Sequence, residues 1–360
     1  AELEVEDVTM TLPFETDNLW ARYREGRVEP SQGRPRMHLS RGTIRIEDDR
    51  LILDDLLGTL GSTDEDAFLV SVPYGVHFEA GPLPAIDWTG EWLDEVLATV
   101  PYEATLDIED FSLDRDAQPS GDAPAMALPL AVAQVLARFE LTGWALDTTV
   151  TVARDRPGEL RSSGHAEIRH AVGQYDKFRY PLHDIEAVLD FANDRLDITR
   201  LVGRGAGDAI VELGGWIAPP TAEGAVAVTL DATDVPLDAA FRAALQDSEQ
   251  RIFDALFDKA SWSAFEEAGL VPDADAIAAA RARLEETDDP VERRRLQRLV
   301  DAGPFELGGQ IDVELEITRP LGADRRTSTS GSIHVDEATV VYEAFPYPVR
   351  TTNSLSLIHI

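Results

Sequence analysis

Acidic side chains are the most numerous groups in this sequence that could do chemistry. The chain has 67 Asp and Glu residues, several of them in runs such as Asp48-Asp49, Asp54-Asp55 and Asp64-Glu65-Asp66. Two carboxyl groups can act as general acid and general base only where their surroundings push their pKa values apart. Nothing in these runs indicates burial. We therefore interpret them as solvated surface and predict no catalytic residue among them.

Metal-binding patterns begin at two places but are not completed. Asp273-Ala274-Asp275 starts as a calcium loop does, yet the turn glycine is missing and Leu284 stands where the bidentate Glu belongs. Among the seven histidines, His165 and His170 are the closest pair, and the chain has no cysteine. On a strand their spacing puts the two imidazoles on opposite sides, unlike the paired histidines of a zinc-protease helix. We expect neither a metal ion nor any other cofactor.

Two further enzyme patterns are also incomplete. Gly203-Arg204-Gly205-Ala206-Gly207 is glycine-rich like a dinucleotide loop, but residues 209–213 alternate as a strand and do not begin a helix. A glycine-flanked serine of the α/β-hydrolase kind is missing from the sequence. We predict that the protein is not an enzyme. The weakest alternative is a carbohydrate-active enzyme on a β scaffold, which would need a cleft with two buried carboxyl groups.

Strand-like alternation dominates the rest of the chain. In residues 311–318 apolar and polar residues alternate with a period of two, which predicts a strand with one dry face and one wet face. The same pattern recurs at residues 3–12, 44–46, 106–108, 144–152, 187–191, 209–213 and 226–230. Between Val5 and Val8 the phase slips by one residue, which indicates a bulge. Strands with one polar face are typical of antiparallel sheets.

Helical spacing is rarer and falls between the groups of strands. We expect helices near residues 88–99 with Asp87 as N-cap, near 127–139, and over about 236–257, 275–286 and 290–302. The second is apolar nearly all round, which predicts a buried helix, and the last two have thin apolar stripes, which predicts a position on the outside. The predicted fold is mainly β (α+β): an elongated twisted antiparallel sheet or groove of repeated strand units with interspersed amphipathic helices.

Internal repeats support a sheet that grows lengthwise. A shift of 167 residues places Gly164, Ala171, Tyr175, Phe178, Tyr180 and Pro181 on Gly331, Ala338, Tyr342, Phe345, Tyr347 and Pro348. A shift of 145 residues aligns 38–58 with 183–203. We expect β units at 1–110 and 111–236, a helical segment at 237–303 that packs on or caps the groove, and a further unit beginning at 304–360. The repeated aromatic residues could line the rim of a groove or fill a corner of the core.

The charge of the chain limits its partners. A net charge of −35 repels phosphate backbones and anionic lipid headgroups, so we expect no nucleic-acid partner. Apolar stretches such as Ala123 to Leu136 fall short of the roughly 18 residues that cross a bilayer. We expect no membrane span in this piece.

One stretch resembles a known family. It runs from Tyr180-Pro181-Leu182 through Asp194-Arg195-Leu196, then through Asp234-Val235-Pro236 and its helix, to the strand ending at Arg319-Pro320. This pattern resembles the C-terminal region of AsmA-like proteins, a group of bridge-like lipid-transfer proteins built from repeating β-groove units. The resemblance implies a periplasmic protein, anchored in the inner membrane by a segment missing from this fragment. It also implies a role in outer-membrane biogenesis, with a groove that conducts glycerophospholipids.

The candidate site is the apolar face of the alternating strands. It consists of Leu189, Phe191, Val211, Leu213, Val228, Leu230, Val313, Leu315 and Ile317. Each acyl methylene withdrawn from water contributes about 0.8 kcal/mol, so such a face needs no specific polar contact to hold a phospholipid. An ordinary closed core has the same periodicity. The alternative is therefore a structural or adhesive cell-surface β-repeat protein whose dry face is filled by its own helices.

Overall fold

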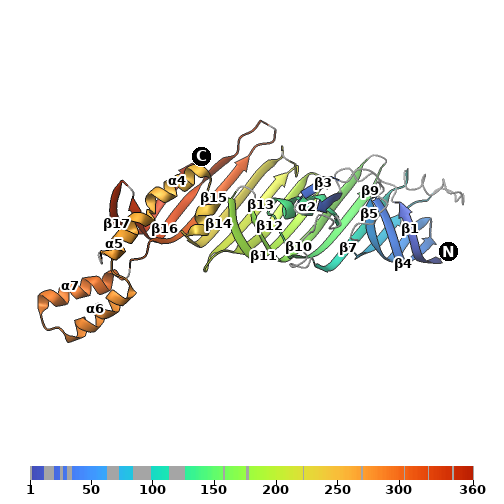
Figure 1. The fold of residues 1–360 in the computed structure, drawn as a ribbon. Coiled ribbons are helices and arrows are strands. Elements are labelled where there is room, and N and C mark those ends of the chain that lie inside the picture. Colours follow the sequence, from blue (N-terminus) through green and yellow to red (C-terminus); the bar gives the residue numbers. More distant parts are fainter. Residues whose placement is uncertain are drawn as a thin grey trace.

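The protein is one long, open antiparallel sheet (Figure 1). The computed structural model describes residues 2–11, 20–24, 27–30, 35–62, 73–83, 99–112, 126–156, 159–175, 178–221, 223–268, 271–303, 305–322, 324–342 and 344–359. Fourteen strands follow one another in chain order. They are β1 (Glu2–Thr11), β4 (Pro35–Glu47), β5 (Arg50–Ser62), β6 (Pro73–Ala80), β7 (Tyr102–Ser112), β9 (Ala145–Arg154), β10 (Leu160–Tyr175), β11 (Phe178–Ala192), β12 (Arg195–Arg204), β13 (Ile210–Ala218), β14 (Ala225–Pro236), β15 (Gly308–Arg319), β16 (Ser328–Tyr342) and β17 (Phe345–His359). The predicted mainly β, elongated fold is confirmed.

The remaining described elements lie in three connections, namely those between β1 and β4, between β7 and β9, and between β14 and β15. A small sheet of β3 (Arg27–Pro30), β2 (Trp20–Arg24) and β8 (Met126–Pro129) lies with α2 (Leu130–Arg138) near the middle of the long sheet (Figure 1). The connection between β14 and β15 holds α3 (Ala239–Ala244), α4 (Asp247–Leu256), α5 (Lys259–Glu267), α6 (Ala274–Glu286) and α7 (Pro290–Ala302). Of these, α6 and α7 form a hairpin that projects from one end of the molecule (Figure 1).

The register of the strands gathers the apolar residues on one face. Cross-strand partners on this face include Leu53 with Phe78, Leu106 with Val150, Leu146 with Ile168, Leu189 with Ile198, Leu213 with Leu230, and Leu230 with Leu315. The opposite face is polar, as in the row of successive partners Asp107, Thr149, His165, Asp190 and Asp197. Period-two alternation has this consequence because successive side chains of a strand point to opposite faces.

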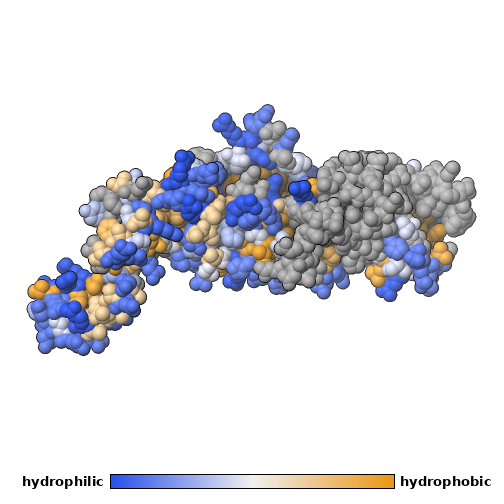
Figure 2. All heavy atoms as spheres, in the orientation of Figure 1, coloured by the Kyte–Doolittle hydropathy of each residue, from blue (hydrophilic) through white to orange (hydrophobic). Residues whose placement is uncertain are grey.

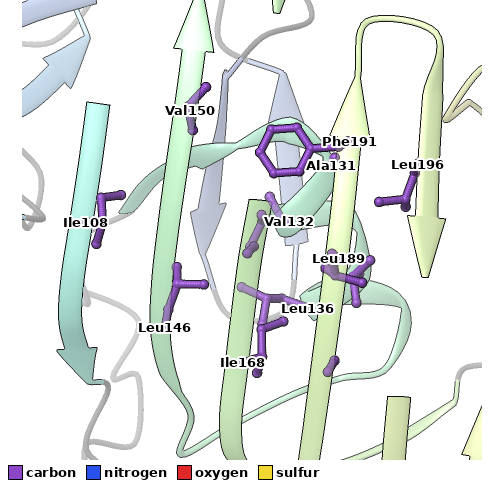
Figure 3. Packing of buried hydrophobic residues seen from close by; sticks show 14 of the residues in the cluster. Ile108, Ala131, Val132, Leu136, Leu146, Val150, Ile168, Leu189, Phe191 and Leu196 are labelled. Carbon is purple, nitrogen blue, oxygen red and sulfur yellow. The ribbon is translucent and has the colours of Figure 1, made fainter. Parts of the chain in front are cut away.

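The buried helix expected near 127–139 is present, but it is shorter. Leu128 belongs to β8 and pairs with Ala21, so the helix begins only at Leu130. Val132 and Leu136 are completely buried. Figure 3 shows the side chains of Val132 and Leu136 directed at strand residues such as Leu189. A helix that is apolar nearly all round thus covers the middle of the apolar face.

The single helix expected over 236–257 is broken in two. Pro236 still pairs with Gln310 as the last residue of β14, and α3 begins only after Asp238, whose carboxylate accepts a hydrogen bond from the Phe241 amide at 2.8 Å. Leu245 and Gln246 have extended backbone, which ends α3 before α4 begins. The short helix α5 that follows was not predicted.

The other helix predictions have clear outcomes. The helices expected at 275–286 and 290–302 are confirmed as α6 and α7. Asp273, the first residue of the calcium-like motif, is the N-cap of α6 and accepts a hydrogen bond from the Ala276 amide at 2.7 Å. Apart from Thr99, the helix expected near 88–99 and its cap Asp87 lie outside the described residues.

The repeated sequence segments form equivalent hairpins. The shift of 167 residues superposes the β10–β11 hairpin on β16–β17, and the shift of 145 residues superposes β4–β5 on β11–β12. The repeat is therefore a two-stranded unit, and the glycine-rich segment at 203–207 is the turn between β12 and β13.

Bulges recur along the sheet. Asp55, Asp110, His170, Asp184 and Asp234 each have a φ between 49° and 58°, and each lies at a register shift between neighbouring strands. Asp is among the few residue types other than Gly that tolerate this backbone region, and such bulges bend a strand. The phase slip expected in the first strand falls at Asp7, whose φ is 55°.

At two bulges the neighbouring strand supplies a carboxylate to the backbone. The Asp110 amide donates a hydrogen bond to Asp147 Oδ1 at 2.6 Å, and the Asp234 amide donates one to Asp312 Oδ1 at 2.9 Å. Asp147 also forms an ion pair with Arg169. The hydrogen bond from Arg169 is the main cause that lowers the pKa of Asp147, and the Asp110 amide adds to it.

Candidate functional site

The apolar face has a sealed part and an open part. Over β9–β11 the side chains of Leu146, Val152 and Leu189 are 0% exposed. All three belong to the same cluster as the buried residues of α2, and Figure 3 shows Leu146 and Leu189 among them. Burial of this kind on the face of a sheet is typical of a closed core. A ligand has no access to this part in the conformation described.

The open part lies over β13–β16. We call it the open strip, and it consists of Val211, Leu213, Ile217, Leu230, Val313, Leu315, Ile317, Ile333 and Val335. All nine side chains are only partly buried. Figure 2, which views the molecule as Figure 1 does, shows apolar surface among polar surface over the elements of this C-terminal half. Neighbouring strands lie about 4.8 Å apart, so four strands give the strip a width of about 14 Å.

The structure places eight of the nine predicted site residues in two groups, and the ninth, Val228, belongs to neither. Leu189 and Phe191, at 0% and 8% exposure, belong to the sealed part on β11. Val228 is 9% exposed and lies on β14 between Gly215 and Ile317. The other six belong to the open strip. Because β12 separates β11 from β13, the two groups adjoin on one face but are covered differently.

Helices border the open strip along one edge. Helix α3 packs on β11, whereas α4 and α5 pack on β16. Aromatic rings link them: the ring centroids of Phe178 and Phe241 are 6.0 Å apart, those of Phe241 and Phe253 6.2 Å, and those of Phe253 and Phe257 4.5 Å. Phe257 then forms a parallel bridge with Val341 of β16. The helices thus run past the ends of β12–β15 from β11 to β16.

A cleft of about 820 Å³ lies between these helices and the sheet. Its apolar lining includes Pro236, Leu237, Phe253, Phe257 and Leu307. Its charged lining residues are Asp238, Arg242, Asp254, Asp258 and Lys259. Sequence reasoning missed this cleft, because α5 and the break between α3 and α4 were not predicted.

One ion pair orders the charged side of the cleft. Arg242 donates two hydrogen bonds to Asp254, from Nε to Oδ1 at 2.5 Å and from Nη2 to Oδ2 at 2.6 Å. The hydrogen bond from Arg242 lowers the pKa of Asp254, and the charge of Lys259 lowers it further. Asp254 therefore stays ionised, and the cleft presents fixed charges of both signs.

The polar face of the sheet holds histidine–carboxylate pairs. His165 Nδ1 lies 2.8 Å from Asp190 Oδ1, and Thr199 Oγ1 donates to Asp190 Oδ2 at 2.8 Å. His170 Nδ1 lies 3.2 Å from Asp184 Oδ1. These side chains are solvent-exposed, and each histidine has its carboxylate on the next strand. Within the described ranges no group of three or more His, Asp or Glu side chains is placed to hold a metal ion.

The repeated aromatic residues differ between the two copies. Tyr180 is buried, and its hydroxyl accepts a hydrogen bond from the Ala206 amide at 3.2 Å. Its counterpart Tyr347 is 60% exposed, and Tyr342, the counterpart of Tyr175, is 48% exposed. Tyr180 of the first copy thus fills a corner of the core, whereas Tyr347 and Tyr342 of the second copy reach the surface.

The comparisons with known proteins add no relative. Neither a protein-family model, nor a curated protein, nor a solved structure matches the chain. The similarity to AsmA-like proteins therefore stays a prediction. None of the helices in the described ranges combines the length and the apolar character needed to cross a membrane.

Proposed function

We propose that the protein is a non-enzymatic lipid-binding protein that holds the acyl chains of glycerophospholipids on the open strip. The observation that supports this most is that side chains on one apolar face differ in solvent exposure from one group of strands to the next. The same face is sealed over β9–β11 and only partly covered over β13–β16. Partly exposed apolar side chains grouped on one face are typical of a surface that meets a ligand or a partner.

The energetics of the strip suit an acyl chain. Each methylene that leaves water contributes about 0.8 kcal/mol, so a chain lying across several strands gains affinity from area alone. A surface made of Val, Leu and Ile side chains offers no directional contact that would select one acyl chain over another. Selectivity would then come from the headgroup.

Transport along the whole sheet is part of the proposal and has a structural requirement. Helix α2 covers the sealed part, including Leu189 and Phe191. Lipid passing from the open strip toward β1 would need α2 to move away from the strands. In this proposal the protein conducts phospholipid through the periplasm toward the outer membrane, as its resemblance to AsmA-like proteins implies, and α2 closes the groove.

A second candidate function rests on the sealed part itself. The packing of Val132 and Leu136 on the sheet is that of an ordinary closed core. It favours a structural or adhesive β-repeat protein, in which the open strip would be the contact surface for another protein.

The substitution Val313→Asp tests the proposed function. Val313 belongs to the open strip on β15, so a charge there should remove bound lipid while the sheet still forms. Thr318→Asp is the matched control, because it adds the same charge to the polar face of the same strand. Mass spectrometry of lipid extracted from the purified proteins, with circular dichroism to verify folding, provides the readout. Folded Val313→Asp protein with a normal lipid content would refute the assignment.

A further inference from the structure

We infer that the cleft between α3–α5 and the β14–β15 end of the sheet is the headgroup site of the bound lipid, and that it takes a zwitterionic headgroup with a phosphate and an ammonium. This inference rests on the proposed function and adds the part of the ligand that the open strip does not select. It combines four observations: the size of the cleft, its position, its charges, and a cleft lysine that makes no hydrogen bond or ion pair within the described residues.

The cleft has the size and position that a headgroup requires. Its volume of about 820 Å³ falls within the roughly 300–1,000 Å³ of small-molecule sites. Pro236, the last residue of β14, and Gly308, the first of β15, are both in its lining. Along these two strands the pairs Val235–Ile311, Ala232–Val313 and Leu230–Leu315 follow one another from the end that lines the cleft toward the open strip. Val235, Ile311 and Ala232 are buried, whereas Val313, Leu230 and Leu315 are partly exposed. A lipid with its headgroup in the cleft would have its acyl chains directed along these strands toward the strip.

Lys259 supplies the group for a phosphate. It is the first residue of α5 and its side chain is exposed. In the part of the chain that the structure describes it makes no hydrogen bond or ion pair, although its charge acts on Asp254. Arg242, the other cation of the cleft, is held by both oxygens of Asp254. A lysine ammonium on a flexible stem binds phosphate as a point charge.

The carboxylates of the cleft supply the counterpart for an ammonium. Asp238, Asp254 and Asp258 oppose Arg242 and Lys259, so these five groups sum to a charge of −1. Asp238 and Asp258 each also cap a helix, which fixes their positions. A headgroup with a net negative charge would meet repulsion here and from the whole chain at −35, whereas a headgroup carrying both charges would not.

A lipid-exchange experiment tests the inference. The full chain, freed of lipid, is incubated with vesicles of equal parts phosphatidylethanolamine and phosphatidylglycerol, re-isolated, and its bound lipid measured by mass spectrometry. The wild type should be enriched in phosphatidylethanolamine. Lys259→Gln should hold about tenfold less of it, as expected for the loss of one charge-assisted contact. Arg281→Gln, which removes an exposed charge from α6, should behave as the wild type.

The other outcomes separate the two proposals. If Val313→Asp loses lipid but Lys259→Gln keeps the amount and the ratio of the wild type, the open strip binds lipid and the headgroup assignment is wrong. Enrichment of phosphatidylglycerol in the wild type overturns the assignment as well.

Competition by soluble compounds distinguishes a lipid headgroup from a free phosphate. If soluble phosphoethanolamine displaces the lipid no better than chloride does, the cleft prefers the headgroup of an intact lipid, as we infer. Full occupation of the cleft by phosphoethanolamine or inorganic phosphate with no effect on bound lipid would show a site for a free phosphate and overturn the inference. A wild type without any lipid would end the proposed function too.

Discussion

At the scale of single residues, exposure divides side chains that the sequence cannot tell apart. Leu189 and Leu315 both occupy apolar positions of alternating strands, yet the first is completely buried and the second partly exposed. Alternation in the sequence predicted correctly that both lie on the apolar face. It could not predict the solvent exposure of either side chain, because exposure depends on which helices, distant in the chain, pack over the strands.

The same truncation at these two positions should therefore have different costs. Leu189→Ala is expected to lower the free energy of unfolding by about 2–5 kcal/mol, because it leaves a cavity in a sealed core. Leu315→Ala should cost less than about half of that, because water can reach the site. Urea denaturation of both variants measures the difference. Equal losses would contradict the division of the face.

The pair His165–Asp190 gives the polar face a pH dependence. The hydrogen bond with Asp190 raises the pKa of His165, and the bond with His165 lowers the pKa of Asp190. The histidine contributes stability that is lost as the pH rises through its raised value, and the carboxylate contributes stability that is lost as the pH falls through its lowered value. The pair thus stabilises the protein most at pH values between the lowered pKa of Asp190 and the raised pKa of His165. Because the pair is exposed, it contributes less than about 1 kcal/mol.

Removing the carboxylate should shift the titration of the histidine. In Asp190→Asn the pKa of His165 is expected to fall toward its ordinary value, as followed by NMR of the imidazole protons. Asp208→Asn, in the turn after β12, should leave that titration where it is. An unchanged His165 titration in Asp190→Asn would show that the hydrogen bond does not form in solution.

At the scale of elements, local patterns predicted eight strands of the long sheet (β1, β4, β7, β9, β11, β13, β14 and β15), both charged helices and the irregularity at Asp7. They failed between Pro236 and Glu267. The apolar spacing there continues across Leu245 and Gln246, so it predicted one helix. The break allows α3 to pack on β11 while α4 and α5 reach β16, which are contacts between distant segments. The cleft that we assign to the headgroup exists only because of that break.

The bulges can be tested through the carboxylate that supports one of them. Asp147→Ala removes the acceptor for the Asp110 amide and the partner of Arg169. Since Asp147 is partly exposed, the expected loss in the free energy of unfolding is about 1 kcal/mol. Glu109→Ala, beside the same bulge and exposed, should be neutral. If the two variants unfold at the same urea concentration, the carboxylate does not stabilise the bulge.

At the scale of the whole molecule, the sheet is open and repetitive. Sequence repeats at shifts of 167 and 145 residues correspond to equivalent hairpins, which is how a sheet extends by adding copies of one unit. The copies are nevertheless covered unequally: α2 lies on the middle and α3–α5 lie along an edge. A sheet with repeated units thus has one stretch with partly exposed apolar side chains, which we propose takes a ligand, and one that is closed by its own chain.

The most direct test of this account is native mass spectrometry of the wild-type protein purified without detergent. Bound phospholipid should appear as an added mass on the folded chain, and fragmentation of the released lipid should show diacyl chains and an ethanolamine phosphate headgroup. A protein that carries no lipid, and takes up none from vesicles, would contradict the central claim that the strip over β13–β16 is a lipid-binding surface.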